Sequence, residues 1–538
     1  MTVRVYSILS IFVYAALSPF IHASETITLP LIRVEEGRLQ DDDGGHYFLR
    51  GINQGRKSPR NLHRSWQQPE DYHNLRRWGM NALRMMMFWS ALEPEPGEYN
   101  EAYLQVLDEQ IDWARDAGLY VILDMHQDLW GYSIPGGNGA PQWATLDDGQ
   151  AHQTLGSVWS TAYYVSPQIQ HAFDNFWKNT KGPGDIGIQD RYAAAWRHVA
   201  ARYADRTEVI GFDLMNEAFP GSMVQESAAA LLELVPKLLD TASLPASLPE
   251  ILDSIDANTM PPWLLEALDN TETYRMILDA LHPMTARFET DYLMPMYERV
   301  HRAIREVNKT GIFFLEPCVL ANIGVATAIT ALKDSEGVRD PLQAYMPHAY
   351  DIVTDTPFSH QPSEKRLQII VQQKRLDAAR LEMPLLIGEW GAYYRSDKTQ
   401  DAARMMNRLL EEAQVCGAFY WEYHRALDTA VYFEVLSKAA PLRVAGILET
   451  ARFNAEEGLF SCQWKNIPGT GVSVFSLPPA WQQKTLDITV SPPELQGEIK
   501  ANPRWQDTPQ LVVDASDSPV TASLEVRLTT PVERAVSP

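Results

Sequence analysis

Short apolar runs recur along the chain from residue 47 onward, and each of them ends in polar or aromatic residues. Near-continuous apolar runs of this length are typical of strands that are buried on both faces of a parallel sheet. The pattern therefore predicts eight strands, within the segments 47–53, 81–89, 120–128, 209–217, 311–317, 344–351, 384–390 and 417–424.

Amphipathic segments separate most of these runs. Their apolar residues recur at helical spacing in 101–119, 191–205, 292–308, 364–382 and 401–417. Eight strands that alternate with helices predict an α/β fold, a (β/α)8 TIM barrel. An open, doubly wound sheet is the structural alternative, but no glycine-rich phosphate-binding turn follows the first strand.

Changes in sequence texture predict three further parts of the chain. The barrel is expected over residues 30–435, with a helical insert at about 220–290. A second insert, 129–188, is rich in Gly, Trp and Tyr and predicts a wall built of loops. After about residue 440 the sequence consists of short alternating runs separated by Pro, Gly and Asp turns. These runs predict a C-terminal antiparallel β-sandwich over 440–538.

The N-terminus has the pattern of a secretory signal peptide over residues 1–23. Arg4 supplies a positive charge, an uncharged and mostly apolar run extends from Val5 to Ile21, and Ala23 is a small residue suited to cleavage. Pro19 and the polar residues after Ser24 argue against a membrane-spanning helix, which needs ~20 apolar residues. The expected location is therefore secreted or periplasmic.

Composition and charge narrow the classes of partner. Of 538 residues, 45% are hydrophobic and 21% are charged, which is typical of a globular protein. The net charge of −23 disfavours nucleic acid, because phosphate backbones would be repelled. The chain has three cysteines, too few for a disulfide framework.

Polar residues at the carboxyl ends of barrel strands are typical of catalytic groups. Glu217 closes the run FDLMNE, and Glu389 lies near the end of LLIGEW. A buried carboxylate is costly unless it is paired, so two of them at core strand ends indicate paired acid/base chemistry. The same strand ends carry Arg84, His126, Asp128, Asn216, His348, Tyr350 and Trp421.

This ordered set of residues resembles glycoside hydrolase family 5, over residues 45–425. The resemblance implies a retaining β-glycosidase in which Glu217 is the acid/base and Glu389 the nucleophile. It also implies that Asn216 contacts the sugar 2-hydroxyl and that Trp421 stacks on a sugar ring. Arg84 and Tyr350 are expected to keep Glu389 ionised, and His348 is expected to support the site. Neither a cofactor nor a metal is implied.

Two stretches, DMHQDLW and FFLEPCVLANIG, resemble the endoglycoceramidase and glucosylceramidase-like group. The resemblance implies cleavage between the glycan and the ceramide of a glycosphingolipid, with His126, Asp128 and Lys57 holding the sugar. The expected partners are a glycolipid or oligosaccharide substrate and a transient contact with a lipid surface. Neither nucleic acid nor a protein partner is expected. Trp263, Leu264 and Leu265 in the helical insert could line a lipid groove or form an ordinary cap core.

Four alternatives to this interpretation exist, of which three stay open. The first is an endo-β-glucanase or mannanase of the same family, for which 15 tryptophans are available. The second is a metal-dependent hydrolase that uses His126, Asp128 and His348. A lysine aldolase needs a lysine at a strand end, and none of the eight runs supplies one. A non-enzymatic sugar-binding protein is the fourth, although both glutamates are present.

Overall fold

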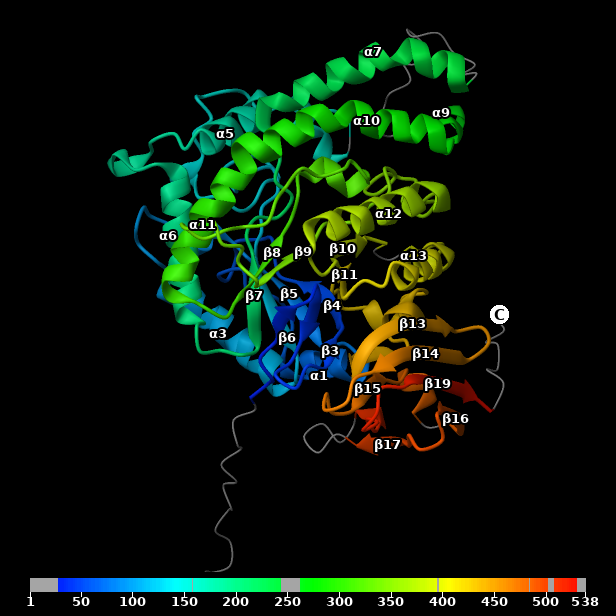
Figure 1. Cartoon of the computed structure of the whole chain (residues 1–538). Coiled ribbons are helices and arrows are strands. Elements are labelled where there is room, and N and C mark those ends of the chain that lie inside the picture. The colour runs from blue at the N-terminus through cyan, green and yellow to red at the C-terminus, as the bar shows by residue number, and fades with distance from the viewer. Residues whose placement is uncertain are drawn as a thin grey trace, which may run out of the picture.

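The structure is a computed structural model that describes residues 28–156, 158–242, 262–393, 396–482, 484–501 and 508–529. Its centre is an eight-stranded parallel sheet (Figure 1) in the order β10-β11-β4-β5-β6-β7-β8-β9. Bridges from Tyr345 to Leu385 and from Ala349 to Trp390 join β9 to β10 and close the barrel. The predicted (β/α)8 barrel is confirmed. Its strands are β4 (Leu49–Gln54), β5 (Ala82–Met87), β6 (Tyr120–Met125), β7 (Val209–Asp213), β8 (Ile312–Leu315), β9 (Gln343–Tyr345), β10 (Leu386–Gly391) and β11 (Gly417–Trp421).

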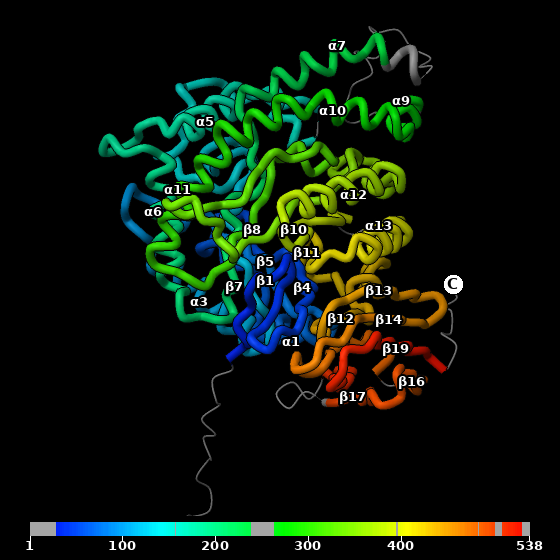
Figure 2. The backbone as a smooth tube through the Cα atoms, in the orientation of Figure 1, coloured from blue at the N-terminus to red at the C-terminus, as the bar shows by residue number. Residues whose placement is uncertain are grey.

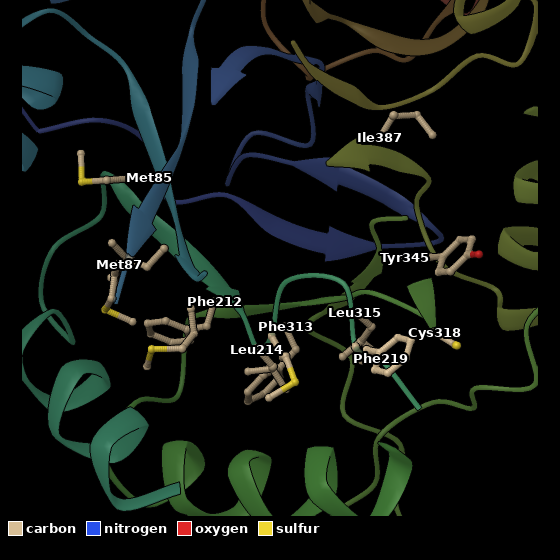
Figure 3. Close-up of a cluster of buried hydrophobic side chains, with 14 of the residues drawn as sticks. Met85, Met87, Phe212, Leu214, Phe219, Phe313, Leu315, Cys318, Tyr345 and Ile387 are labelled. Carbon is tan, nitrogen blue, oxygen red and sulfur yellow. The ribbon is translucent and has the colours of Figure 1, made fainter. Parts of the chain in front are cut away.

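Helices surround the barrel, and all five predicted helical segments are present as α3, α6, α11, α12 and α13. Side chains mark where two of them begin, because Asn100 caps α3 and Ser363 caps α12. Outward-facing apolar residues of the strands pack on the helices, and Figure 3 shows part of this layer around Met85, Phe212 and Leu315. The helices are α1 (Pro69–Arg77), α2 (Trp89–Leu92), α3 (Glu101–Asp116), α6 (Ile188–Arg202), α11 (Met294–Val307), α12 (Glu364–Leu381), α13 (Gln400–Glu412) and α14 (Phe433–Leu436).

The inward-facing side chains change from apolar to charged along several of the strands. In β8, Ile312 and Phe314 pack in the barrel interior, and Glu316 follows two residues later. In the same way Met346 precedes His348 after β9. Side chains alternate with period two along a strand, so this order places the charges together at the carboxyl end of the barrel.

The N-terminal strands β1 (Arg33–Glu35), β2 (Arg38–Gln40) and β3 (His46–Tyr47) depart from the predicted domain boundaries. The sequence assigned residues 30–47 to the barrel, but β3 pairs antiparallel with β12 of the C-terminal region. Leu29, Ile32 and Leu39 pack against the apolar amino end of the barrel interior. This segment therefore closes the barrel floor and at the same time extends a sheet of the sandwich.

The C-terminal region consists of two antiparallel sheets that face each other. One has the order β1-β2-β3-β12-β15-β18-β17, and the other has the order β13-β14-β19-β16. Burial alternates along β14, where Phe460, Cys462 and Trp464 point into the core. The strands are β12 (Ala440–Val444), β13 (Gly446–Asn454), β14 (Leu459–Asn466), β15 (Ser473–Ser476), β16 (Leu486–Ser491), β17 (Gly497–Ala501), β18 (Pro509–Val513) and β19 (Thr521–Leu528).

The insert predicted to be helical contains helices, whereas the insert predicted to consist of loops also contains helices. The insert after β7 contains α7 (Val224–Ala242), α9 (Pro262–Leu268) and α10 (Thr271–Phe288), and α7 packs beside α10 (Figure 2). The insert 129–188 is not built of loops alone, because it contains α4 (Ala162–Val165) and α5 (Pro167–Trp177). In the described part of the chain, no helix combines the length and apolarity needed to cross a bilayer. The predicted signal peptide lies outside the described residues.

Candidate active site

The predicted site residues converge at the carboxyl ends of the barrel strands. Eight of them line a single cavity of about 230 Å³, namely Lys57, His126, Asp128, Asn216, Glu217, Tyr350, Glu389 and Trp421. Arg84 and His348 lie beneath this cavity and are fully buried. All ten residues therefore belong to one cluster, although they come from seven different strands.

Arg84 is the centre of the hydrogen-bond network beneath the cavity. Its Nη1 donates to Glu389 Oε1 at 2.7 Å, and its Nη2 donates to Asn216 Oδ1 at 2.9 Å. Further hydrogen bonds and ion pairs of the same guanidinium involve Asn53, Asp124, Asp213 and Glu316. A planar guanidinium with five N–H groups suits this role, because it can hold several acceptors in fixed directions at once.

Glu217 points into the cavity from the loop that follows β7. Its backbone has a left-handed φ of 44°, which is uncommon for a residue other than glycine. The Glu217 N–H donates to Glu316 Oε2 at 3.0 Å, and this hydrogen bond helps to hold the conformation. Asn322 Nδ2 donates to Glu217 Oε1 at 2.7 Å, and His348 Nδ1 lies 2.8 Å from the same oxygen.

Glu389 lies opposite Glu217 at the end of β10. Besides the hydrogen bond from Arg84, its Oε2 accepts one from the Tyr350 hydroxyl at 2.9 Å. One oxygen of Glu389, one of Glu217 and a nitrogen of His348 all lie within 4.8 Å of one another. Burial raises the pKa of the Glu389 carboxyl, and although His348 and Arg84 oppose it, the pKa stays above its usual range. Arg84 lowers the pKa of Glu389, as the sequence suggested, but burial raises that pKa by more.

His348 is the cation between the carboxylates. Burial alone would lower the pKa of its imidazole, but Glu316 and Glu389 outweigh burial and hold the pKa well above the usual range. Its Nε2 lies 3.1 Å from Glu316 Oε1. Glu217, His348 and Glu389 therefore form a charge-paired cluster.

A second charged group lies on the other side of the cavity. Lys57 Nζ lies 2.6 Å from Asp128 Oδ2, and His126 Nδ1 lies 2.8 Å from Asp124 Oδ2. Burial opposes the charged form of His126, but Asp124 outweighs it and the pKa of the imidazole rises to about 9. Burial alone would raise the pKa of Asp128, but Lys57 reverses this and lowers it. This group offers sugar hydroxyls both charged donors and a carboxylate acceptor.

Trp421 and Asn216 combine structural contacts with cavity lining. The Trp421 ring stacks on His126 with centroids 5.5 Å apart, and Lys57 Nζ lies 4.5 Å from the Trp421 ring centroid. Asn216 Nδ2 donates one hydrogen bond to the Gln127 carbonyl oxygen at 3.1 Å. Because an amide nitrogen carries two hydrogens, its second N–H can serve a sugar hydroxyl.

Four residues of the site were missed by sequence reasoning. Glu316 and Asn322 hold Glu217, while Asp124 and Asp213 hold Arg84 and His126. Asp124, Asp213 and Glu316 are charged residues at or near the ends of apolar runs, and that was the available signal. Asn322 lies in the short turn Val319–Ile323 after β8, and its signal was the stretch FFLEPCVLANIG that carried the resemblance.

The apolar side of the cavity does not come from the residues proposed for a lipid groove. Tyr163, Tyr164, Phe219 and Val319 line it, whereas Trp263, Leu264 and Leu265 do not. The three insert residues belong to α9 and are only partly buried there. An apolar contact for an aglycone is therefore available, but from the insert 129–188 and the loops after β7 and β8.

Replacing Tyr350 with Phe is expected to move the acid limb of the pH profile to higher pH. The hydroxyl favours the ionised form of Glu389, so its loss raises the pKa of that carboxyl further. Activity that needs the ionised form is lost as pH falls through this pKa, so the loss then occurs at higher pH. A lost hydrogen bond to a charge also lowers kcat/KM by about 10- to 100-fold. The pH dependence of kcat/KM on an aryl glycoside is the measurement, and an unchanged acid limb would contradict the assignment.

Comparison with known proteins agrees with this geometry. Residues 43–242 match the model of the family Cellulase (glycosyl hydrolase family 5). Endoglycoceramidase I of Rhodococcus hoagii is 33% identical over 158 residues, which cover 29% of this chain and 30% of that protein. A glucosylceramidase of Aspergillus fumigatus is 41% identical over 182 residues, covering 27% of this chain and 24% of that protein. The matches to endoglycoceramidases span about a third of those proteins' own length.

The likeness in structure extends over nearly the whole chain. A structure of endo-glycoceramidase II from Rhodococcus sp., in a ganglioside GM3 complex, has a TM-score of 0.69 at 23% identity. The superposition covers 92% of this chain and 100% of the other chain, so the two proteins share the fold of both the barrel and the sandwich. The predicted resemblance is therefore confirmed: residues 43–242 match the model of glycosyl hydrolase family 5, and the chain is similar to endoglycoceramidases and glucosylceramidases.

Proposed function

We propose that this protein is a retaining β-glycosidase that hydrolyses the bond between sugar and ceramide in glycosphingolipids. The observation that carries the proposal is the approach of Glu217 and Glu389 across the cavity, with oxygens within 4.8 Å of each other. Retaining enzymes need carboxyl groups ~5–5.5 Å apart, while inverting enzymes need ~6.5–9.5 Å to admit a water molecule. The short separation supports a double displacement.

The first step divides the work between the two glutamates. A Glu389 oxygen attacks the anomeric carbon as the glycosidic C–O bond breaks, and Glu217 gives its proton to the departing oxygen. The two hydrogen bonds that Glu217 accepts from Asn322 and His348 both involve Oε1, so Oε2 is the oxygen assigned to carry the proton. Arg84 and Tyr350 orient Glu389 for attack.

The second step releases the sugar. Glu217 takes a proton from water, and the resulting oxygen attacks the anomeric carbon as its ester bond to Glu389 breaks. Glu389 leaves as a carboxylate next to Arg84 and the His348 imidazolium, both of which favour its charged form. Two displacements restore the β configuration at the anomeric carbon.

Replacing Glu217 with Ala is expected to slow hydrolysis of a glycolipid by about 10²- to 10⁴-fold, the usual contribution of general acid catalysis. Glycosides with a very acidic leaving group need no protonation, so their first step should be nearly normal. Azide should then accelerate the second step and yield a β-glycosyl azide. Product NMR and burst kinetics check this result, and an equal loss on both leaving groups would contradict the acid role.

The sugar–ceramide bond is proposed from two supports. Curated relatives bear the names endoglycoceramidase and glucosylceramidase, and a structural neighbour is described in a ganglioside GM3 complex. The residues that line the cavity also divide into charged ones, such as Lys57 and Asp128, and apolar or aromatic ones, such as Tyr164, Phe219 and Val319. A molecule with a sugar head and an apolar aglycone matches that division.

The test is product analysis of the purified protein. Glucosylceramide, a long-glycan glycosphingolipid and a short cello-oligosaccharide are incubated separately, and products are identified by mass spectrometry. Released ceramide supports the proposal, and proton NMR of the first sugar released reports its configuration. Cleaved cello-oligosaccharide without ceramide would instead support a polysaccharide hydrolase, the alternative that the name of the matched family model favours. An α-configured first product would overturn the retaining mechanism.

We also propose that the protein is exported. The support is the charge and apolarity pattern of residues 1–23. N-terminal sequencing of the protein recovered outside the cytoplasm tests this proposal, and a mature chain that still begins at Met1 would contradict it.

A further inference from the structure

Two loops, one after β6 and one after β9, meet at the cavity. Trp159 belongs to the insert after β6, and Asp355 belongs to the loop after β9. The Trp159 indole Nε1 donates to Asp355 Oδ2 at 3.0 Å, and both residues line the same cavity as the two glutamates. Asp355 has a left-handed φ of 63°, a conformation that Asp tolerates better than most residues. We call this contact the Trp159–Asp355 bridge.

The bridge lies close to Lys57, which is expected to hold the sugar, and the Trp159 ring centroid also lies 6.2 Å from that of Tyr163. Lys57 Nζ lies 5.9 Å from the Trp159 ring centroid and 4.5 Å from that of Trp421. Lys57 is also paired with Asp128. A reacting sugar held by Lys57 and Asp128 would therefore lie close to the Trp159 ring, and a further sugar attached on that side would meet it.

The size of the cavity agrees with this boundary. Its volume of about 230 Å³ is below the ~300–1,000 Å³ of pockets that enclose drug-sized ligands. One sugar ring fits this space better than an oligosaccharide does. The Trp159 side chain is 41% exposed, so its position depends on few packing contacts and on its hydrogen bond to Asp355.

We propose that the Trp159–Asp355 bridge closes the glycan side of the pocket and restricts the enzyme to glycolipids that carry a single sugar. The inference rests on the proposed glycosidase function and deepens it. Trp159 supplies the bulk of the barrier, and Asp355 holds it over Lys57. The two residues determine specificity, and neither takes part in bond cleavage.

The test compares one-sugar and two-sugar substrates in two series. The first series is glucosylceramide against lactosylceramide, and the second is an aryl β-glucoside against the aryl β-lactoside. The wild-type protein should prefer the one-sugar substrate in both series. Trp159→Ala should raise the two-sugar to one-sugar ratio of kcat/KM by about tenfold or more, because a single methylene in a pocket already changes discrimination by ~10- to 200-fold.

Variants that break only the hydrogen bond separate its role from that of the ring. Trp159→Phe and Asp355→Ala should each raise the ratio by less than Trp159→Ala does. Their double variant should not add, because both remove the same contact. Tyr132→Ala is the matched control, since Tyr132 is a 48% exposed aromatic residue of the same insert that does not line the cavity. The two-sugar to one-sugar ratio of kcat/KM in Tyr132→Ala should equal that of the wild-type protein.

The outcomes distinguish failure of this inference from failure of the proposed glycosidase function. Equal cleavage of one- and two-sugar substrates by the wild-type protein, or an unchanged ratio in folded Trp159→Ala, overturns the inference alone. Changed ratios on the aryl glycosides without cleavage of either glycolipid support the bridge and overturn the ceramide substrate. Absence of turnover on all four substrates overturns the glycosidase proposal and the inference with it.

Discussion

Glu389→Gln is expected to lower kcat/KM by about 10⁴-fold or more, because removing the nucleophile of a covalent mechanism costs up to ~10⁶-fold in a comparable hydrolase. Gln has nearly the same shape as Glu, but its amide cannot form the glycosyl ester. Gln can still accept a hydrogen bond from Arg84 through its amide oxygen. Substrate binding should therefore survive the loss of turnover, and calorimetry with a slow substrate can measure it.

A covalent label separates the nucleophile from a residue that only supports it. A 2-fluoro aryl glycoside slows the second displacement, so the sugar should accumulate on the peptide that contains Glu389. Mass spectrometry should find this adduct in the wild-type protein and not in Glu389→Gln. Glu272→Gln is the control, because Glu272 lies exposed in the first turn of α10, outside the cavity. A label on another residue, or substantial turnover by Glu389→Gln, would reassign the nucleophile.

The strand-end residues could be predicted because the barrel fold converts sequence order into position. Once eight apolar runs are accepted as parallel strands, their carboxyl ends must meet, and Glu217 and Glu389 must lie near each other. Lys57 could be predicted only through the resemblance, since it lies in a loop. Its 2.6 Å contact with Asp128 joins residues that are 71 positions apart, and no local pattern reports such a contact.

The parts that the sequence did not predict depend on contacts over long distances in the chain. Strands β1 to β3 have only two or three residues each, too few for a periodic pattern, and β3 pairs with β12 almost 400 residues later. The bridge between Trp159 and Asp355 joins two loops in the same way. Loops carry little periodic signal, so their meeting points become visible only in the folded structure.

Arg84→Met is expected to be the most destabilising single substitution near the site. It removes the guanidinium that pairs with Asp124, Asp213, Glu316 and Glu389, all of them buried. Burial and Glu316 already raise the pKa of Asp213 well above its usual range. Without Arg84 the remaining carboxylates would lose their main cation, and breaking a buried pair in this way costs about 3–5 kcal/mol.

Two further variants test whether the loss of stability in Arg84→Met comes from the buried ion pairs of Arg84. Arg84→Lys keeps the charge, but one ammonium cannot reach Asp213, Glu316 and Glu389 in the fixed directions of a guanidinium, so stability should recover in part and activity should not. Arg197→Met is the matched control, because Arg197 forms an exposed pair with Glu306 that should contribute only ~0–1 kcal/mol.

Urea unfolding followed by tryptophan fluorescence, together with kcat/KM at the same pH, provides the measurement. Loss of both stability and activity in Arg84→Met, with partial recovery of stability but not of activity in Arg84→Lys, would show that one residue serves two functions. It neutralises the carboxylates of the barrel, and it aims Glu389 and Asn216 at the sugar. Unchanged stability in Arg84→Met would mean that the buried carboxyls take up protons when the cation is removed. In that case the pKa of Asp213 would have to rise further, and stability should then fall as pH increases.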